Sequence, residues 1–262
     1  NRDSENTYDE NQPDEKDFLS IEEAQTLVEQ FLSTEYSQDY LASFIDHAVL
    51  DPAMTLEQLK ANIMIGVNYN CKSICVNPSV IDIAKECILN SNVKLCVVCD
   101  FPFGQSHKAS KVAQAQAIIA KGDIFEIDLV ANYGLIKSHQ LDIVTDEIKA
   151  VSEVCHQHGV SLKVIIESDA LSDDEIKDAV ACCIAGKADF VKTSTGYLKS
   201  DHIEGASPRV IELIVKEANG KIKVKGSGCV RSKERLIELI ELGIDRAGVG
   251  CSSTKKILGD NE

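Results

Sequence analysis

The stretch Leu162-Lys-Val-Ile-Ile-Glu167, together with the later stretch Asp189-Phe-Val-Lys-Thr-Ser194, decides the fold. Each is an apolar run of strand length that ends in polar residues, and the segment between them has the spacing of a helix. A strand, a helix and a second strand in this order form a unit whose two strands lie parallel in one sheet. These residues therefore predict an α/β protein.

The same unit recurs along the chain. The predicted strands are Phe44–His47, Ser73–Val76, Lys94–Asp100, Phe125–Val130, Leu162–Glu167, Asp189–Ser194, Ile222–Lys225 and Arg246–Gly250. Helical segments fill the gaps, and Thr55-Leu-Glu-Gln58 forms a capping box that starts one of them. Eight such units predict a closed (β/α)8 TIM barrel. An open doubly wound sheet is the alternative, but its glycine-rich first turn is absent from Asp46-His-Ala-Val-Leu-Asp-Pro52.

Segments at both ends lie outside this repeat. Residues 1–17 contain seven acidic residues and almost nothing apolar, which predicts a disordered acidic tail. Ser20-Ile-Glu-Glu23 is a capping box that opens an amphipathic helix. Residues 18–43 therefore predict an N-terminal helical extension, residues 44–258 the barrel, and residues 259–262 a short C-terminal tail.

Composition limits the possible partners and the compartment. The net charge of −15 disfavours nucleic acid, whose phosphates select basic surfaces. No apolar run approaches the roughly 18 residues of a membrane span, so we expect no membrane partner. The ten cysteines lie mostly within apolar runs, which predicts buried, reduced thiols and a cytoplasmic protein.

Polar residues end several predicted strands, where barrels of this kind place their active sites. They are Asp46, Asn77, Asp100, Asp128, Glu167, Lys192, Thr193, Ser194 and Lys225. Alternate residues of a strand face the same side. This parity predicts that Lys192, Lys225 and Asp128 converge at the mouth of the barrel.

Two lysines and an aspartate have a specific chemical use together. A nucleophilic lysine must be neutral, and a buried pocket with a second cation nearby favours the neutral amine. Lys192 would condense with an aldehyde to an imine, and Asp128 would move the proton of a hydroxyl. This chemistry predicts neither a metal nor another cofactor. A lysine at a strand end is also commonly a salt-bridged or snorkelling residue, so this pattern by itself predicts only a barrel enzyme.

Three motifs resemble those of deoxyribose-phosphate aldolases. They are Lys192-Thr-Ser-Thr-Gly-Tyr197, Glu126-Ile-Asp-Leu-Val130 and Val224-Lys-Gly-Ser-Gly-Cys-Val-Arg231. Further blocks at matching spacing are Ile45–Leu50, Cys75–Pro78, Phe101–Gly104 and Lys163–Glu167. The resemblance covers roughly residues 42–258. It implies reversible cleavage of 2-deoxyribose 5-phosphate to acetaldehyde and glyceraldehyde 3-phosphate, within carbohydrate and deoxyribonucleotide catabolism, by a class I aldolase that could form a homo-oligomer such as a dimer.

The resemblance also implies roles for individual residues. Lys192 forms the Schiff base, and Lys225 and Asp128 handle protons. Several further residues would bind the substrate, some of them by holding its phosphate through backbone N–H groups. The predicted substrate-binding residues are Asp46, Thr193, Gly196, Gly228, Cys229, Gly248, Gly250 and Cys251.

The chain departs from the family pattern near the expected phosphate site. Ala48 replaces a usual threonine, Cys229 replaces a glycine, and Gly248-Val-Gly-Cys251 replaces a serine-rich turn. These changes favour, as an alternative, an aldolase-like protein with weakened or shifted activity that serves as a binding or scaffold module. An imine-forming barrel enzyme of the transaldolase kind is a third interpretation.

Two further side chains carry expectations of their own. Lys223 stands where the family often has glycine, and strand parity predicts a buried ammonium that pairs with Glu126, alongside Lys163. Cys96 and Cys99 have metal-like spacing, but residues three apart on a strand face opposite sides, so we expect no shared ligand site.

Overall fold

A computed structural model describes residues 19–259 of the chain. The predicted tail 1–17 and residues 260–262 lie outside the described residues. The chain divides into two compact units, Asn1–Ser37 and Gln38–Glu262. The first contains helix α1 (Ile21–Glu35), in which several of the described apolar side chains are exposed, among them Ile21 and Phe31. The second contains the predicted barrel and also the short helix α2 (Gln38–Ala42), which the sequence had grouped with the extension.

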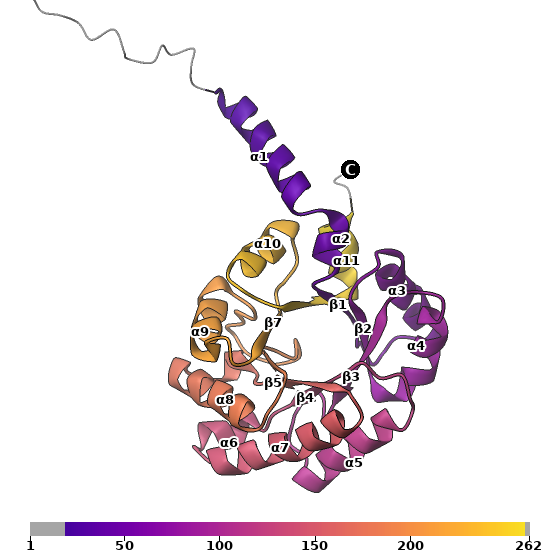
Figure 1. Cartoon of the computed structure of the whole chain (residues 1–262), viewed down its shortest axis with the longest axis vertical. Helices are drawn as coiled ribbons and strands as arrows, with labels where there is room; N and C mark the ends of the chain where they lie inside the picture. The colour runs from indigo at the N-terminus through magenta and orange to yellow at the C-terminus, as the bar shows by residue number, and fades with distance from the viewer. Residues whose placement is uncertain (1–18, 260–262) are drawn as a thin grey trace, which may run out of the picture. The chain divides into compact units, whose positions relative to one another are not determined.

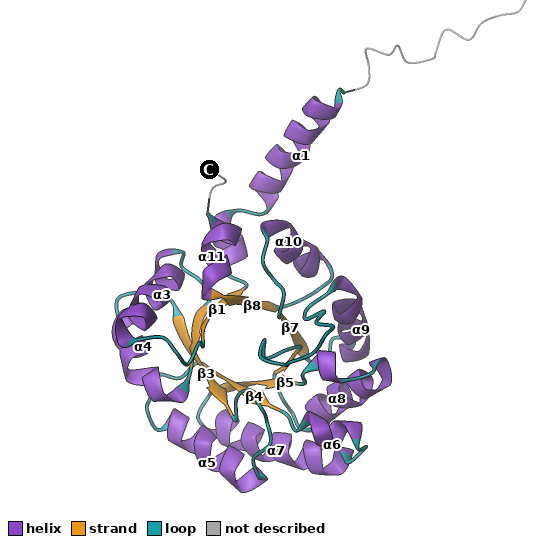
Figure 2. Cartoon of the chain, turned by 180° about the vertical axis from the view of Figure 1, so that it is seen from behind, coloured by secondary structure: helices purple, strands orange, loops and turns teal. Residues whose placement is uncertain are grey.

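Eight parallel strands form the closed barrel that the sequence predicted (Figures 1 and 2). The strands follow one another around the ring in chain order, and β8 pairs with β1 to close it, with Ile45 opposite Ala247. Their bounds are β1 (Ile45–Val49), β2 (Ser73–Val76), β3 (Lys94–Cys99), β4 (Glu126–Val130), β5 (Ser161–Ile165), β6 (Phe190–Lys192), β7 (Lys223–Ser227) and β8 (Arg246–Gly250).

Helices surround the barrel on its outside, as both views show (Figures 1 and 2). They are α3 (Leu56–Asn68), α4 (Ile81–Ile88), α5 (Lys108–Ile119), α6 (Tyr133–Lys137), α7 (Leu141–Gln157), α8 (Asp173–Ala185), α9 (Pro208–Ala218), α10 (Lys233–Glu241) and α11 (Cys251–Leu258). The predicted capping box of Thr55 and Gln58 starts α3, because each side chain bonds the backbone N–H of the other. None of the helices within residues 19–259 combines the length and apolarity that crossing a membrane requires.

Strand β1 shows how parity separates the two faces of the barrel wall. His47 points outward to the helices, where its ring nitrogens bond Thr254 Oγ1 at 2.7 Å and the Asn62 carbonyl at 2.8 Å. Gly66 of α3 lies so close to this ring that an added Cβ would come within 2.6 Å of it. The neighbours Asp46 and Ala48 therefore face the interior. His47 is a packing residue, and the interior face of β1 carries one charged and one small side chain, Asp46 and Ala48.

Candidate active site

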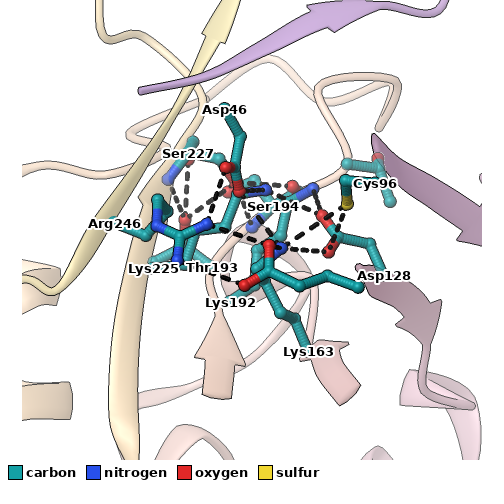
Figure 3. A network of polar contacts seen from close by, with 12 residues as sticks. Asp46, Cys96, Asp128, Lys163, Lys192, Thr193, Ser194, Lys225, Ser227 and Arg246 are labelled. Carbon is teal, nitrogen blue, oxygen red and sulfur yellow. Dashed lines mark hydrogen bonds and ion pairs between the residues drawn. The ribbon is translucent and has the colours of Figure 1, made fainter. Parts of the chain in front are cut away.

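Seven ionisable side chains fill the interior of the barrel, and Figure 3 shows most of them at close range. Three are carboxylates and four are cations, and each is at most 6% exposed. They come from six of the eight strands, and we call them the interior charge cluster. Its members are Asp46, Glu126, Asp128, Lys163, Lys192, Lys225 and Arg246.

Asp128 joins the two lysines that the sequence singled out. Its Oδ2 accepts hydrogen bonds from Lys192 Nζ and Lys225 Nζ, both at 2.8 Å. The two lysines stand directly opposite each other on β6 and β7. Asp128 Oδ1 accepts a third bond from Lys163 Nζ at 3.1 Å. The structure thus brings together the three residues for which strand parity predicted convergence (Figure 3).

A second layer of ion pairs lies around Asp46. This carboxylate contacts Lys225 Nζ at 2.6 Å, Arg246 at 2.8 Å and Lys163 at 3.2 Å. Glu126 pairs with Lys163 and accepts two bonds from Arg246, at 2.9 and 3.1 Å. The sequence analysis missed Arg246 as a member of this cluster. Because Arg246 starts its strand, the sequence did not indicate that its side chain would be buried in the barrel interior. It does share a strand face with Gly248 and Gly250.

Burial and charge act in opposite directions on these groups. Burial alone would raise the pKa of Asp128, but Lys163, Lys192 and Lys225 hold it well below its usual value. Burial alone would lower the pKa of Lys225, but the carboxylates of Asp128 and Asp46 raise it above its usual range. Asp128 is therefore an anion and Lys225 a cation across the neutral pH range.

The charge balance singles out Lys192. Of the four cations in the cluster, it is the one that contacts a single carboxylate, Asp128, among the described residues. Three carboxylates face four cations, so one positive charge is in excess when all are ionised. Lys192 is therefore the lysine with the fewest acidic contacts, which suits the role of a nucleophilic amine.

A cavity of about 410 Å³ opens above the cluster. Both Lys192 and Lys225 line it, as do six of the eight predicted substrate-binding residues. Those six are Gly196, Gly228, Cys229, Gly248, Gly250 and Cys251.

The other two predicted substrate-binding residues, Asp46 and Thr193, do not line the cavity. Asp46 lies a layer deeper, because it precedes Ala48 by two residues on β1 and Ala48 lines the cavity. Thr193 Oγ1 donates to the Ser227 carbonyl at 2.6 Å and so joins the ends of β6 and β7. The sequence could not separate these depths, because the stagger of neighbouring strands sets them.

Glycines allow the backbone to approach the cavity closely. Gly196 and Gly228 have φ values of 83° and 86°, in the left-handed region that favours glycine. A Cβ at Gly248 would lie 2.7 Å from the Ser227 Cβ and 3.2 Å from Lys225 Cε, so only glycine lets the Lys225 side chain pass. Cys229 adopts φ 60° with a full side chain, in place of the glycine that the family pattern has there.

Several polar residues at the cavity were not predicted as site residues. Helix α11 begins at Cys251, so its N-terminal end, with Ser252 and Ser253, faces the cavity and favours an anion. Arg231 also lines the cavity. Ser194 Oγ is buried and has no hydrogen-bond partner among the described residues, although Ser194 lines the cavity. Ser194 ended a predicted strand, which was the signal that could have identified it.

Glu167 anchors the loop that carries Gly196. Its carboxylate accepts bonds from the Thr195 N–H at 3.1 Å and from Thr195 Oγ1 at 2.5 Å. Burial raises the pKa of Glu167, against the two bonds from Thr195 that lower it. The carboxylate thus holds the loop beside the cavity without lining it.

The predicted pairing of Lys223 with Glu126 is wrong. Lys223 is exposed, and its ammonium lies 5.4 Å from the centroid of the Phe190 ring. It starts β7 at the end of the barrel away from the cavity, so its side chain reaches water. Arg246 takes the place beside Glu126, because β8 is in register with Lys225 opposite Arg246.

The fold and the site together define a class I aldolase, a barrel enzyme whose chemistry depends on a lysine amine. The family model described as DeoC/LacD family aldolase matches residues 40–259. The chain belongs to this family, which bears out the resemblance found in its motifs.

Individual relatives agree with this assignment. A protein of Mycoplasmopsis pulmonis named deoxyribose-phosphate aldolase is 37% identical over 222 residues, covering 85% of this chain and 97% of its own. One of Staphylococcus haemolyticus with the same name is 39% identical over 207 residues, or 79% and 91% of the two chains.

Solved structures share the architecture. A structure described as QR15, an aldolase, superposes with a TM-score of 0.75 at 33% identity and covers 83% of this chain and 94% of its own. The tetrameric deoxyribose phosphate aldolase of Aeropyrum pernix has a TM-score of 0.75 at 28% identity, over 90% and 96% of the two chains.

Proposed function

We propose that this protein cleaves 2-deoxyribose 5-phosphate reversibly into acetaldehyde and glyceraldehyde 3-phosphate through a Schiff base on Lys192. One observation carries the proposal: a single oxygen of Asp128 lies 2.8 Å from both Lys192 Nζ and Lys225 Nζ beneath a cavity of substrate size. The names of the relatives support the choice of substrate.

The reaction begins at the amine with the fewest acidic contacts. Neutral Lys192 attacks C1 of the open-chain aldehyde, and loss of water gives a protonated imine. This imine withdraws electrons as the C3 hydroxyl loses its proton and the C3–C4 bond breaks. Glyceraldehyde 3-phosphate leaves, the remaining enamine is protonated at C2, and hydrolysis of the imine releases acetaldehyde and Lys192.

Lys225 and Asp128 handle the protons as a pair. The C3 hydroxyl proton passes to Asp128, which holds it only briefly because its pKa lies well below its usual range. The Lys225 ammonium gives a proton to C2 of the enamine and recovers one from Asp128, 2.8 Å away, so the pair ends as it began. Asp128 fixes the direction of that ammonium and of the Lys192 amine through its two hydrogen bonds. The same carboxylate stabilises the positive charge of the imine.

The phosphate would rest at the far side of the cavity. Backbone N–H groups at Gly196, Gly228 and Cys229 and the N-terminal end of α11 are donors suited to an anion. Arg231 adds the charge, and Ser194 offers a free hydroxyl to the substrate.

An aldolase-like protein with weakened or shifted activity is the second candidate. Cys229 favours it, because a side chain occupies a left-handed position in the turn that would hold the phosphate. Turnover of 2-deoxyribose 5-phosphate compared with unphosphorylated deoxyribose separates the two. Equal turnover rates for the two sugars at low substrate concentration would favour the second candidate, because they would show that the phosphate group does not contribute to binding.

Trapping of the imine tests the proposal directly. Borohydride added with substrate should reduce the imine and leave a covalent adduct on Lys192, found by peptide mass mapping. Lys192→Ala should remove both adduct and turnover while the barrel stays folded, as judged by circular dichroism. An adduct on Lys225, or turnover in Lys192→Ala, contradicts the assignment.

We further propose that the protein assembles into a homo-oligomer and acts in the cytoplasm. The Aeropyrum pernix relative is described as tetrameric, whereas the sequence analysis favoured a dimer. Light scattering on the eluting protein distinguishes a dimer from a tetramer, and a monomer would contradict both.

A further inference from the structure

Two cysteine thiols lie side by side in the wall of the same barrel. Cys75 of β2 and Cys96 of β3 stand opposite each other in the strand register. Neighbouring strands are about 4.8 Å apart, within the range of Cα separations at which cysteines can be bridged. Both sulfur atoms and a carboxylate oxygen of Asp128 lie within 4.8 Å of one another. The pair is therefore part of the interior beside the catalytic carboxylate.

The two thiols have different surroundings. Cys75 lines the cavity, together with Lys192 and Lys225. Cys96 lies behind it, where its thiol donates to Asp128 Oδ1 at 3.2 Å and its sulfur accepts from Lys163 Nζ at 3.5 Å. A small molecule that enters the cavity can therefore contact Cys75 directly, whereas Cys96 lies behind Cys75 on the neighbouring strand.

Its neighbours make Cys75 the more acidic thiol. The contact with the Cys96 side chain lowers the pKa of Cys75, and the Lys225 ammonium lowers it further, against burial and Asp128, which raise it. Burial raises the pKa of Cys96 well above its usual value. Because the thiolate is the reactive form of cysteine, the arrangement pairs a nucleophile with a protonated partner.

Other buried cysteines lack this arrangement. Cys99, three residues after Cys96, faces the helices and contacts the Lys111 carbonyl at 3.7 Å, as expected from strand parity. Burial raises the pKa of Cys99, and likewise that of Cys155, to about 12. Neither residue lines the cavity, so both serve as internal controls.

We propose that Cys75 and Cys96 form an oxidisable dithiol, which a small hydroperoxide entering the sugar cavity converts to a disulfide. The Cys75 thiolate attacks one oxygen of hydrogen peroxide, the O–O bond breaks, and the leaving hydroxide takes a proton to form water. Cys75 is then a sulfenic acid. The Cys96 sulfur attacks the Cys75 sulfur, and the departing hydroxyl leaves with the Cys96 proton as a second water. Peroxide is reduced by two electrons, and two thiols are oxidised to one disulfide.

Oxidation changes the surroundings of Asp128. The disulfide removes the S–H that donates to Asp128 Oδ1 and fixes the Cys75 sulfur at the cavity wall. We expect aldolase turnover to fall on oxidation and to return with a dithiol reductant. This consequence rests on the proposed function, whereas formation of the disulfide does not.

Peptide mapping of the whole protein tests the proposal. The protein is treated with hydrogen peroxide, its remaining thiols are alkylated after denaturation, and the digest is analysed without reduction. We expect the peptides of Cys75 and Cys96 to appear linked, at the mass of their sum less two hydrogen atoms, while Cys99 and Cys155 are alkylated. Cys96→Ser should stop the reaction at a sulfenic acid on Cys75 that dimedone traps, and Cys75→Ser should leave Cys96 reduced.

The outcomes separate this inference from the proposed function. Linked peptides in a protein with no turnover before oxidation support the dithiol and reject the aldolase. An active protein in which peroxide modifies exposed Cys229 while Cys75 and Cys96 are both alkylated overturns the dithiol. Oxidation of Cys75 to a sulfinic acid beside an unlinked Cys96 overturns it as well, since Cys96 would then be out of reach. The wild-type map decides the matter even if a variant fails to fold.

Discussion

Lys192 and Lys225 are the same residue type on neighbouring strands and bond the same carboxylate oxygen, yet their surroundings differ. Lys225 also contacts Asp46 at 2.6 Å and is held as a cation. Lys192 contacts one carboxylate and lines the cavity. Since both lysines are buried, we attribute the proposed division between nucleophile and proton donor to the number of acidic neighbours.

The buried carboxylates predict how stability depends on acidity. The folded pKa of Asp46 lies below the unfolded value of about 3.9, because Lys163, Lys225 and Arg246 outweigh burial, which would raise it. A group with a lowered folded pKa stabilises the fold fully above its unfolded pKa, and this contribution is lost as the pH falls through the folded pKa. We expect the difference in unfolding free energy between wild type and Asp46→Asn to be constant from about pH 7 to pH 5 and to shrink below about pH 4.

Urea denaturation at a series of pH values measures this difference. Asp82→Asn is the matched control, because Asp82 pairs with Lys121 at the exposed surface. Its difference from wild type should be small at every pH. A gap between wild type and Asp46→Asn that widens on acidification would contradict the expected ionisation.

Cys229 offers a test of the phosphate turn. Cys229→Gly removes a side chain at φ 60° and lets an anion approach the backbone N–H groups more closely. We expect KM for 2-deoxyribose 5-phosphate to fall by about five-fold, equivalent to about 1 kcal/mol, with KM for unphosphorylated deoxyribose unchanged. Steady-state kinetics with both sugars checks this, and an equal change for both sugars would place the residue away from the phosphate.

At the scale of elements, a buried lysine outside the cluster ties two strand ends together. Lys111 of α5 is 1% exposed and donates to the carbonyls of Gly104, at 3.0 Å, and Val130, at 2.9 Å. It also contacts the carboxylates of Asp100 and Glu147, both at 3.4 Å. Because Asp100 follows β3 and Val130 ends β4, the lysine fixes the ends of β3 and of β4, the strand that carries Asp128.

Neutralising this lysine should therefore weaken the whole fold. Lys111→Met leaves two carboxylates and two carbonyls without their partner, and we expect a loss of about 3–5 kcal/mol in the free energy of unfolding. Chemical denaturation measures it. Lys108→Met on the same helix is the control, because Lys108 lies at the surface in a pair with Asp146. A loss in Lys111→Met no larger than in this control would show that the tie is unimportant.

At the scale of the whole molecule, the alternation of apolar and helical segments predicted all eight strands, the closed barrel and the meeting of Lys192, Lys225 and Asp128. Depth along the barrel axis was not predictable. Asp46 is buried and does not line the cavity, Arg246 is interior, and Lys223 is exposed at the opposite end. The sequence of one strand predicts which face of the sheet each residue lies on. The position of that residue along the barrel axis depends on the stagger between neighbouring strands, which the sequence does not show.

The division of the chain predicts that the first unit is dispensable for chemistry. All of the cavity-lining residues and the interior charge cluster belong to Gln38–Glu262. Removing residues 1–37 should leave kcat and KM for the aldol reaction unchanged. Steady-state kinetics of the shortened chain checks this, and a loss of kcat in a well-folded shortened chain would mean that the first unit takes part in catalysis.

The interior charge cluster also constrains how this enzyme can be redesigned. Its seven groups join six strands by ion pairs, so the residues proposed for catalysis also stabilise the barrel. Replacing one of them to install a new reaction would leave a buried charge without its partner. A protein engineer would therefore do better to change the loops around the cavity, or to replace opposite charges two at a time.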